Sequence, residues 1–448
     1  MARRVAGAAS LRAPRRSPTT QLSGPWLRPQ GRRPASPSTP RARHAKRARW
    51  SRSALVALLV VVVLVLVGTL QLARPLPVPL ARTVLARSST IPGVISPIPW
   101  PAQGQGAVAV PALGMVLASG AEQPVPVASL TKIMTAYIVL RDHPLAPGAQ
   151  GPAVVINASD QTETYEEVDA NDSSIPVQVG EVLSERQLLD GLLVHSANNF
   201  GDVLARWDAG SVGVFVAKMN AAAASLGMSE THYADSGGID PRSVSTALDE
   251  LRVATAAMSI PTFAAVVAQP KITLPVAGTL MNYVGQVGSD GVVGVKSGFT
   301  QAAMGCLVLA AQRRIGGHRV EVMAAVTGQP GLHPLDAAAR ATLPLIGATV
   351  VSLRSVPVTP RSRRVATVTT PWSSTVVAGT PTSTPSMVVW PGDTVRRSMR
   401  WAQLRGGAPA GTRLGTMEVT VGSERLEVPV RSESPIPGPS LLWRLWRF

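Results

Sequence analysis

The sequence predicts an α/β (α+β) protein in which helices pack against an antiparallel sheet, with a small β-sandwich after that domain and one transmembrane helix before it. Apolar residues recur at helical spacing between residues 129 and 268, and short strand-like runs flank this region. Beyond Val351, alternating Val, Thr and Arg separated by Pro and Gly are typical of short sandwich strands. Residues 53–73 are apolar and uncharged, which predicts the membrane helix.

These changes in composition divide the chain of 448 residues into six segments, and its length leaves room for two or three domains. The predicted segments are a disordered basic tail (1–52), the transmembrane helix (53–73), a Pro-rich spacer (74–100), the main domain (101–350), a β-rich domain (351–435) and an aromatic and basic tail (436–448). The last tail could contact the membrane interface or dock on a domain, and the sequence leaves both open.

Positive charge is concentrated at the N-terminus. The formal net charge is +17, but residues 1–52 contain 14 Lys or Arg and no acidic residue, which leaves 29 basic against 26 acidic residues beyond them. The near-neutral remainder argues against folded domains that bind nucleic acid. The tail is also rich in Pro, Ser and Gly, so it cannot bury a core and is predicted to be disordered.

The run Ser53–Ala73 has no polar face, which disfavours a buried core helix. Because cationic residues precede it, the positive-inside rule predicts a single-pass cell-membrane protein with a cytoplasmic N-terminus and an extracytoplasmic main domain. A cleaved signal peptide is the competing interpretation. It is disfavoured by the long basic region, by Gln71 and by Pro75. The single cysteine, Cys306, excludes an intramolecular disulfide.

Ser129 and Lys132 lie three residues apart at the start of a helix predicted from Ile133, Tyr137 and Leu140. The two side chains should therefore share one face. A serine hydroxyl is a weak nucleophile until a base accepts its proton, and a lysine can be that base when burial keeps it neutral. A capping serine followed by a surface lysine is the simpler interpretation, because this spacing is common.

Two further short motifs carry polar groups that could bind or react. The first, Ser196-Ala197-Asn198, interrupts two predicted helices; its serine could relay a proton and its asparagine could hold an amide, although both are also ordinary capping residues. The second, Lys296-Ser297-Gly298, ends an apolar strand. Gly298 would let a ligand backbone approach the strand, and Lys296 would place a charge near an anionic group.

The acidic stretch 157–174 is predicted to be a solvated loop. A metal site is the alternative, but the acids lack regular ligand spacing and no histidine lies among them. His195, next to the second motif, has no His/Asp partner spacing and is interpreted as a packed or surface histidine.

The Ser129/Lys132 pair, the Ser196 motif and the Lys296 motif follow one another along the chain. In this order they resemble the three motifs of the D-alanyl-D-alanine carboxypeptidases, the low-molecular-mass penicillin-binding proteins, which share a fold with β-lactamases. The surrounding segments 128–136 and 216–233 resemble that family as well. The resemblance covers roughly residues 100–350, and residues 411–431 are similar to the C-terminal domain of many members. Ala197 and Ser297 depart from the usual glycine and threonine.

The resemblance implies an enzyme that removes the terminal D-alanine from peptidoglycan stem peptides and that β-lactams inhibit covalently. Ser129 would form the acyl-enzyme, and Lys132 would take its proton with help from Lys296, whose charge would lower the Lys132 pKa. Ser196 would pass a proton to the leaving amine, and Asn198 would hold the substrate amide.

The same resemblance gives roles to the residues around Gly298. Ser297 and Thr300 would bind the terminal carboxylate, and the backbone N–H groups of Ser129 and Phe299 would form the oxyanion hole. No metal or cofactor is implied.

Two alternatives stay open at this point. A class A β-lactamase would need a glutamate-bearing loop between the second and third motifs, where Glu230 and Glu250 are the only glutamates and neither lies in such a pattern. A membrane-anchored peptidoglycan-binding protein without turnover is the non-enzymatic alternative.

Overall fold

The computed structural model describes residues 51–120, 122–170, 172–359 and 363–447. The chain divides into two compact units, residues 1–68 and 69–448, and each is described by itself. The prediction of a disordered basic tail falls almost wholly outside the described residues. Helix α1, Arg52–Ala73, confirms the predicted helix and is long and apolar enough to cross a membrane.

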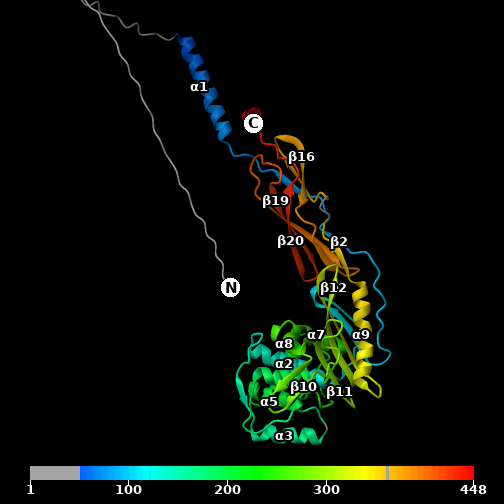
Figure 1. Cartoon of the computed structure of the whole chain (residues 1–448). Coiled ribbons are helices and arrows are strands. Elements are labelled where there is room, and N and C mark those ends of the chain that lie inside the picture. Colours follow the sequence, from blue (N-terminus) through cyan, green and yellow to red (C-terminus); the bar gives the residue numbers. More distant parts are fainter. Residues whose placement is uncertain (1–50, 121, 171, 360–362, 448) are drawn as a thin grey trace, which may run out of the picture. The chain divides into compact units, whose positions relative to one another are not determined.

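A five-stranded antiparallel sheet forms the centre of the main domain, in the order β11-β12-β13-β3-β4 (Figure 1). Its strands are β3 (Gln105–Val110), β4 (Met115–Ala118), β11 (Val292–Thr300), β12 (Met304–Ile315) and β13 (His318–Gln329). The early strand β3 pairs with the late strand β13, and Ala324 lies opposite Val108. The two ends of the domain therefore meet in one sheet.

Helices cover both faces of this sheet, as the alternation along β12 requires. Cys306, Val308 and Ala310 belong to one buried cluster with six helices from residues 131–267, whereas Leu307 and Leu309 belong to a second cluster with the helix at residues 334–352. The helices of the first cluster are α2 (Thr131–Asp142), α4 (Glu185–Val194), α5 (Asn198–Ala209), α6 (Val212–Ser225), α7 (Ala247–Met258) and α8 (Pro261–Val267). Helix α9, Pro334–Ser352, covers the other face (Figure 1). The predicted architecture of helices on an antiparallel sheet is confirmed.

The acidic stretch is a helix, and the prediction of a loop was wrong. Helix α3 spans Ala158–Asp169 and begins with a capping box, in which Asn157 and Asp160 each accept a hydrogen bond from the other's backbone N–H. Arg206 pairs with Asp160 and ties the helix to α5. Because α3 buries polar rather than apolar side chains, its sequence lacks the apolar periodicity that predicts helices. Among the described residues, no acidic, His or Cys cluster could hold a metal.

The C-terminal domain is β-rich, and it recruits part of the predicted spacer. Its seven-stranded sheet has the order β1-β15-β16-β20-β19-β18-β2, and β14 (Arg354–Pro357) pairs separately with β17 (Ser386–Val389). The other strands are β15 (Ala366–Thr370), β16 (Ser373–Pro381), β18 (Thr394–Trp401), β19 (Arg413–Val421) and β20 (Glu424–Ser432).

Both edge strands, β1 (Leu80–Thr83) and β2 (Ser88–Thr90), come from residues 74–100. The prediction of a purely extended spacer over residues 74–100 was therefore wrong. Strands of three and four residues among prolines give no detectable alternation, but they are tolerated at sheet edges.

The final tail contains helix α10, Leu441–Trp446. Arg444 donates a hydrogen bond to the Leu72 carbonyl oxygen at 2.7 Å, and Arg447 donates one to the Arg74 carbonyl oxygen at 2.6 Å. Leu72 lies in the last turn of α1 and Arg74 directly follows the helix, where a helix leaves its last acceptors without intrahelical donors. The tail therefore contacts the chain next to the predicted membrane helix, and its contact with the membrane interface stays a prediction.

Candidate active site

Ser129 and Lys132 meet at the start of α2. Ser129 lies in a short 3-10 turn, Ala128–Leu130, which leads directly into the helix. The Lys132 Nζ atom lies 2.8 Å from the Ser129 Oγ atom. Lys132 is fully buried, whereas Ser129 lines a cavity. The pair thus has the geometry in which an amine can accept the proton of a hydroxyl group.

Burial lowers the pKa of Lys132 from its ordinary value of 10.5 to about 8. The negative charges of Asp235 and Glu167 act in the opposite direction and limit the shift. A large fraction of the Lys132 side chains is therefore neutral near pH 8, and only a neutral amine can act as a base.

The second motif and a distant loop complete the surroundings of Lys132. Its Nζ atom lies 2.5 Å from the Asn198 Oδ1 atom and 2.8 Å from the Gly237 carbonyl oxygen. The Asn198 Nδ2 atom is buried and has no hydrogen-bond partner among the described residues. Since Asn198 also lines the cavity, this amide group is available to a ligand carbonyl.

Ser196 precedes the first turn of α5 and also lines the cavity. Its backbone has a φ of +65°, in the left-handed region that few non-glycine residues adopt. Backbone strain of this kind persists only where surrounding contacts hold it, and it is common at functional sites.

Asn199 connects this turn to the part of the cavity wall that contains Ala170, Asp172 and Ser173. Its side chain binds the backbone N–H of Ile175 at 3.2 Å and the carbonyl oxygen of Ile175 at 2.8 Å, while its own backbone N–H donates to Glu167 of α3 at 3.0 Å. The Asn198 N–H also donates to the Ser173 carbonyl oxygen at 2.8 Å. These bonds hold the second motif and α3 in a fixed relation.

The third motif lies on β11 directly beside the Ser129 turn. A Cβ atom on Gly298 would lie 2.8 Å from the Ser129 backbone nitrogen and 3.2 Å from that of Leu130. Gly298 therefore allows a close approach of the chain's own backbone, and because it also lines the cavity, the close approach of a ligand stays a prediction. This contact brings the N–H groups of Ser129 and Phe299, the expected oxyanion hole, to adjoining parts of the site.

The other hydroxyl groups of β11 already have partners. Ser297 donates to the Tyr283 carbonyl oxygen at 3.1 Å, and Thr300 Oγ1 accepts a bond from the Ala303 N–H at 3.1 Å. Both side chains nevertheless line the cavity, and Phe299 beside them is 46% exposed.

Lys296 does not line the cavity. It is fully buried behind the wall, and its Nζ atom donates to the Ser297 carbonyl oxygen at 2.8 Å. Burial, and then the charge of Lys132, hold the Lys296 pKa well below its ordinary value. The resemblance implied that Lys296 lowers the Lys132 pKa, but burial is the main cause at Lys132 and the like-charge effect falls on Lys296.

The cavity has a volume of about 460 Å³. Of the residues that the sequence singled out, seven line it: Ser129, Ser196, Asn198, Ser297, Gly298, Phe299 and Thr300. Sequence reasoning missed the other lining residues, which are Ala170, Asp172, Ser173, Ile239, Tyr283, Gln301 and Leu335. They come from loops and from the start of α9, where no local pattern marks them. The contact of the Gly237 carbonyl oxygen with Lys132 was not predictable, because 105 residues separate the two in the sequence.

Comparison with known proteins identifies the family to which this chain is similar. Residues 105–330 match the family model described as D-alanyl-D-alanine carboxypeptidase. The chain is 36% identical to D-alanyl-D-alanine carboxypeptidase DacB2 of Mycobacterium tuberculosis over 218 residues, 47% of this chain and 69% of that protein. It is 32% identical to a D-alanyl-D-alanine endopeptidase of Pseudomonas aeruginosa over 194 residues, 41% of this chain and 59% of that protein.

Among solved structures, D-alanyl-D-alanine carboxypeptidase DacD from Francisella tularensis superposes with a TM-score of 0.52, covering 77% of this chain and 97% of that one at 19% identity. At this identity the match shows the fold alone. The family model spans half of the chain, and the Mycobacterium relative is matched over two thirds of its length. The chain therefore belongs to the D-alanyl-D-alanine carboxypeptidase family of peptidases.

Proposed function

We propose that the chain is a membrane-anchored serine-type carboxypeptidase that removes the terminal D-alanine from peptidoglycan stem peptides. One observation carries this proposal: the buried Lys132 amine, whose pKa is lowered to about 8, lies 2.8 Å from the Ser129 hydroxyl oxygen. A neutral base in contact with a hydroxyl group that opens into a cavity is the arrangement that activates a serine nucleophile.

In the first step, the Ser129 oxygen attacks the carbonyl carbon between the two D-alanines while Lys132 takes the hydroxyl proton. The backbone N–H groups of Ser129 and Phe299 stabilise the negative oxygen that develops, each contributing roughly 3 kcal/mol. The C–N bond then breaks. Ser196 donates its hydroxyl proton to the departing amine and receives in its place the proton held by Lys132. D-alanine therefore leaves with a neutral amino group, and an ester remains on Ser129.

In the second step, water hydrolyses the ester. Lys132 has returned its proton and is again a base, so it can take one from the water as the oxygen attacks. The Ser129–acyl bond breaks, the shortened peptide leaves with a carboxylate, and Ser129 regains its proton.

Substrate orientation is assigned to the cavity wall. Asn198 offers its unpartnered Nδ2 group to the peptide carbonyl, and Ser297 with Thr300 offers hydroxyl groups to the terminal carboxylate. Lys296 acts from behind the wall as a positioning residue, because its fully buried Nζ atom donates a hydrogen bond to the Ser297 carbonyl oxygen and so holds the strand that carries these hydroxyl groups.

The proposal is tested with the full-length protein in detergent. A peptide ending in two D-alanines should release one D-alanine per molecule, and penicillin should add its mass to the tryptic peptide containing Ser129. Ser129→Ala should abolish both. A cross-linked dimer should be tested in parallel, because one relative is named an endopeptidase. Cleavage of the dimer alone, without D-alanine release, would contradict the carboxypeptidase proposal.

Membrane topology is part of the same proposal. Helix α1 is the single helix in the described residues that is itself long and apolar enough to span a membrane, and the basic residues lie before it. Residues 1–52 are therefore assigned to the cytoplasm. Protease added to intact, sealed cells should digest the catalytic domain and spare the tail. The reverse pattern would overturn the orientation, and a mature N-terminus beyond Ala73 would show a cleaved signal.

A further inference from the structure

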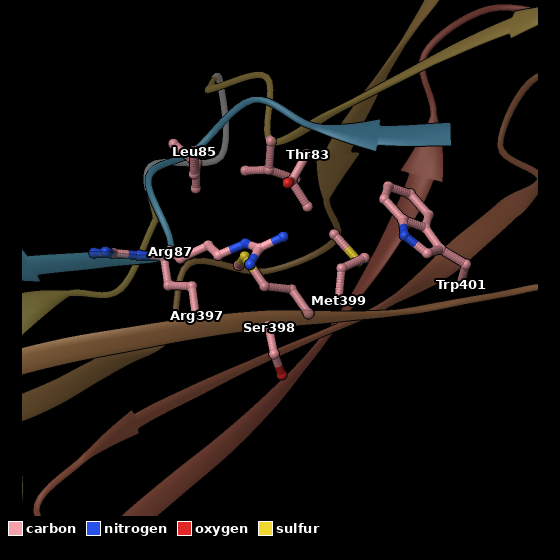
Figure 2. A pocket seen from close by; sticks show the side chains of 9 residues that line it. Thr83, Leu85, Arg87, Arg397, Ser398, Met399 and Trp401 are labelled. Atoms are coloured by element: carbon pink, nitrogen blue, oxygen red, sulfur yellow. The ribbon is translucent and has the colours of Figure 1, made fainter. Parts of the chain in front are cut away.

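The C-terminal domain has a cavity of its own, and none of the motif residues lines it. It has a volume of about 330 Å³ and is lined by Thr83, Leu85, Arg87, Val365, Arg397, Ser398, Met399, Trp401 and Met417. Figure 2 shows that its walls come from the former spacer (Thr83, Leu85, Arg87) and from β18 (Arg397, Met399, Trp401), while Ser398 points to the other side of the strand. An adjoining hollow shares Arg87 and Arg397 and adds Arg396.

The arginines of this cavity have no acidic partners. Arg87, Arg396 and Arg397 form no ion pair within the described parts of the chain, whereas Arg400 and Arg425 of the same sheet pair with glutamates. Arg397 Nη1 donates to the Ser89 hydroxyl at 2.9 Å, but its Nε atom is buried without a partner there. A buried donor without a partner is costly unless something outside the protein binds it.

Two of these cations are also neighbours across a strand pair. The Arg397 N–H donates to the Arg87 carbonyl oxygen at 2.7 Å, next to the pairing of Arg396 with Ser88. Like charges on adjacent strands repel and reduce stability. Burial, and then the charge of Arg363, lower the Arg397 pKa. An anion in the cavity would relieve this repulsion.

The C-terminal domain as a whole carries more positive charge than the catalytic domain. Residues 351–448 contain 13 arginines and no lysine against five acidic residues, whereas residues 101–350 contain 13 basic and 21 acidic residues. The acidic side chain at the adjoining hollow, Glu418, is already paired with Arg425 at 2.7 Å. The domain therefore attracts anions that the catalytic domain repels.

The remaining lining is apolar and partly aromatic. Trp401 is 37% exposed, and Met399 and Leu85 are half-buried beside the cavity. We propose that this cavity, which lies outside the peptidase site, binds an anionic saccharide, meaning a sugar ring that carries a carboxylate or a phosphodiester. The planar guanidinium groups of Arg87 and Arg397 match either anion in bidentate fashion, and Trp401 offers a flat apolar surface to the ring.

A saccharide fits better than a membrane surface for a geometric reason. Lipid headgroups are attracted by dispersed basic residues on an open surface, but here the unpaired arginines line a hollow of limited volume next to one tryptophan. Ligand cavities of this kind combine an apolar lining with a few placed polar groups. Bound there, an anionic wall glycan would hold the protein on the polymer whose peptides its catalytic domain is proposed to cut.

The test uses the full-length protein in detergent with two fluorescent probes, oligogalacturonate (carboxylate) and phosphomannan (phosphodiester). At least one should bind, and a neutral maltooligosaccharide of equal length should not. Arg87→Gln/Arg397→Gln should weaken binding about tenfold or more. Poly-L-glutamate serves as an anion without a sugar ring. Trp401→Ala should weaken binding of whichever saccharide probe binds, but leave poly-L-glutamate binding unchanged. D-alanine release by each variant shows that it has folded.

The matched control is Arg354→Gln/Arg405→Gln, which removes the same charge at two exposed arginines of the same domain outside the cavity. It should retain binding within about twofold. Equal losses in both double variants would mean general attraction to a basic domain and would overturn the site. Binding of neither probe, or displacement of the probe by phosphatidylglycerol vesicles but not by unlabelled glycan, would overturn it as well. Should the double variant fail to fold, Trp401→Ala and the vesicle competition decide the matter.

Discussion

The Lys132 Nζ atom lies 2.8 Å from the Ser129 Oγ atom, and the amine is fully buried while the hydroxyl group borders a cavity. The base is thus protected from water and the nucleophile is accessible to substrate. Because burial disfavours the ammonium form, the same packing that hides Lys132 also leaves its amine neutral, and so able to accept a proton, at moderate pH.

The first prediction concerns the dependence of these two residues on each other. Ser129→Ala and Lys132→Ala should each reduce D-alanine release by roughly 10³-fold or more, and the double variant should be no worse than either, because nucleophile and base act as one unit. The two single variants and the double variant are purified and assayed separately. Activity of Lys132→Ala within about tenfold of the wild type, a barrier change of about 1.4 kcal/mol, would rule out lysine as the base.

The second prediction is the pH dependence. Lys132 is a base only when neutral, and its pKa in the folded protein is about 8. The kcat/KM for D-alanine release should therefore rise with pH and level off above about pH 8, since this ratio reports the ionisation of the free enzyme. The unfolded chain releases this proton only near 10.5. The contribution of Lys132 to the free energy of unfolding therefore also rises with pH between the two values. A flat profile from pH 6 to 9 would contradict the assignment.

A single carboxylate tests the electrostatics behind this profile. Glu167 raises the Lys132 pKa, so Glu167→Gln should move the midpoint to lower pH. The shift should be small, because burial raises the Glu167 pKa itself to about 8 and the two groups titrate together. Glu166→Gln, on the same helix and exposed, is the matched control and should leave the midpoint unchanged.

The third prediction concerns the contact between β11 and the Ser129 turn. In Gly298→Ala the new Cβ atom would lie 2.8 Å from the Ser129 nitrogen, so one of the two backbones must move. A displacement of this size at the nucleophile should reduce penicillin acylation and D-alanine release by about a hundredfold. Both rates are measured, together with the melting temperature.

The control for Gly298→Ala is Gly347→Ala in the interior of α9, where a Cβ atom would meet nothing within 4 Å. Activity should be unchanged there, and stability should rise by about 0.5–1 kcal/mol because alanine favours the helix. Full activity in Gly298→Ala would mean that the close approach does not constrain the nucleophile.

The sequence predicted what local patterns encode. The helix after Ser129 has apolar residues at three- and four-residue steps, and Thr246 with Asp249 gives the N-terminal signal of α7, so both helices were predictable. The three motifs were each weak, yet their order along the chain identified the family, and the structure brings them to one cavity.

What the sequence did not predict depends on tertiary contacts or on weak local signals. Helix α3 is held by its capping box and by Arg206 rather than by an apolar face. Strands β1 and β2 are short edge strands among prolines, and β18 carries arginines where aliphatic residues would mark a strand. The Gly237 carbonyl reaches Lys132 from a loop 105 residues away, a contact that only the folded chain creates.

The last prediction concerns the fate of the acyl-enzyme. The described residues that line the cavity include no glutamate, and their one carboxylate is Asp172. Glu250 is fully buried away from the cavity, and Glu230 does not line it. The glutamate that a β-lactamase uses to activate its deacylating water therefore has no counterpart among these lining residues.

With the peptide, D-alanine departs and leaves room for water to reach the ester beside Lys132, so release should be prompt. With penicillin, the opened ring stays attached and blocks that approach, so the adduct on Ser129 should last from minutes to hours. Intact-protein mass spectrometry at timed intervals measures its decay. Asp172→Asn should leave the lifetime within about twofold, whereas steady penicillin hydrolysis at about 10 per second, an ordinary enzymatic turnover, would contradict the prediction.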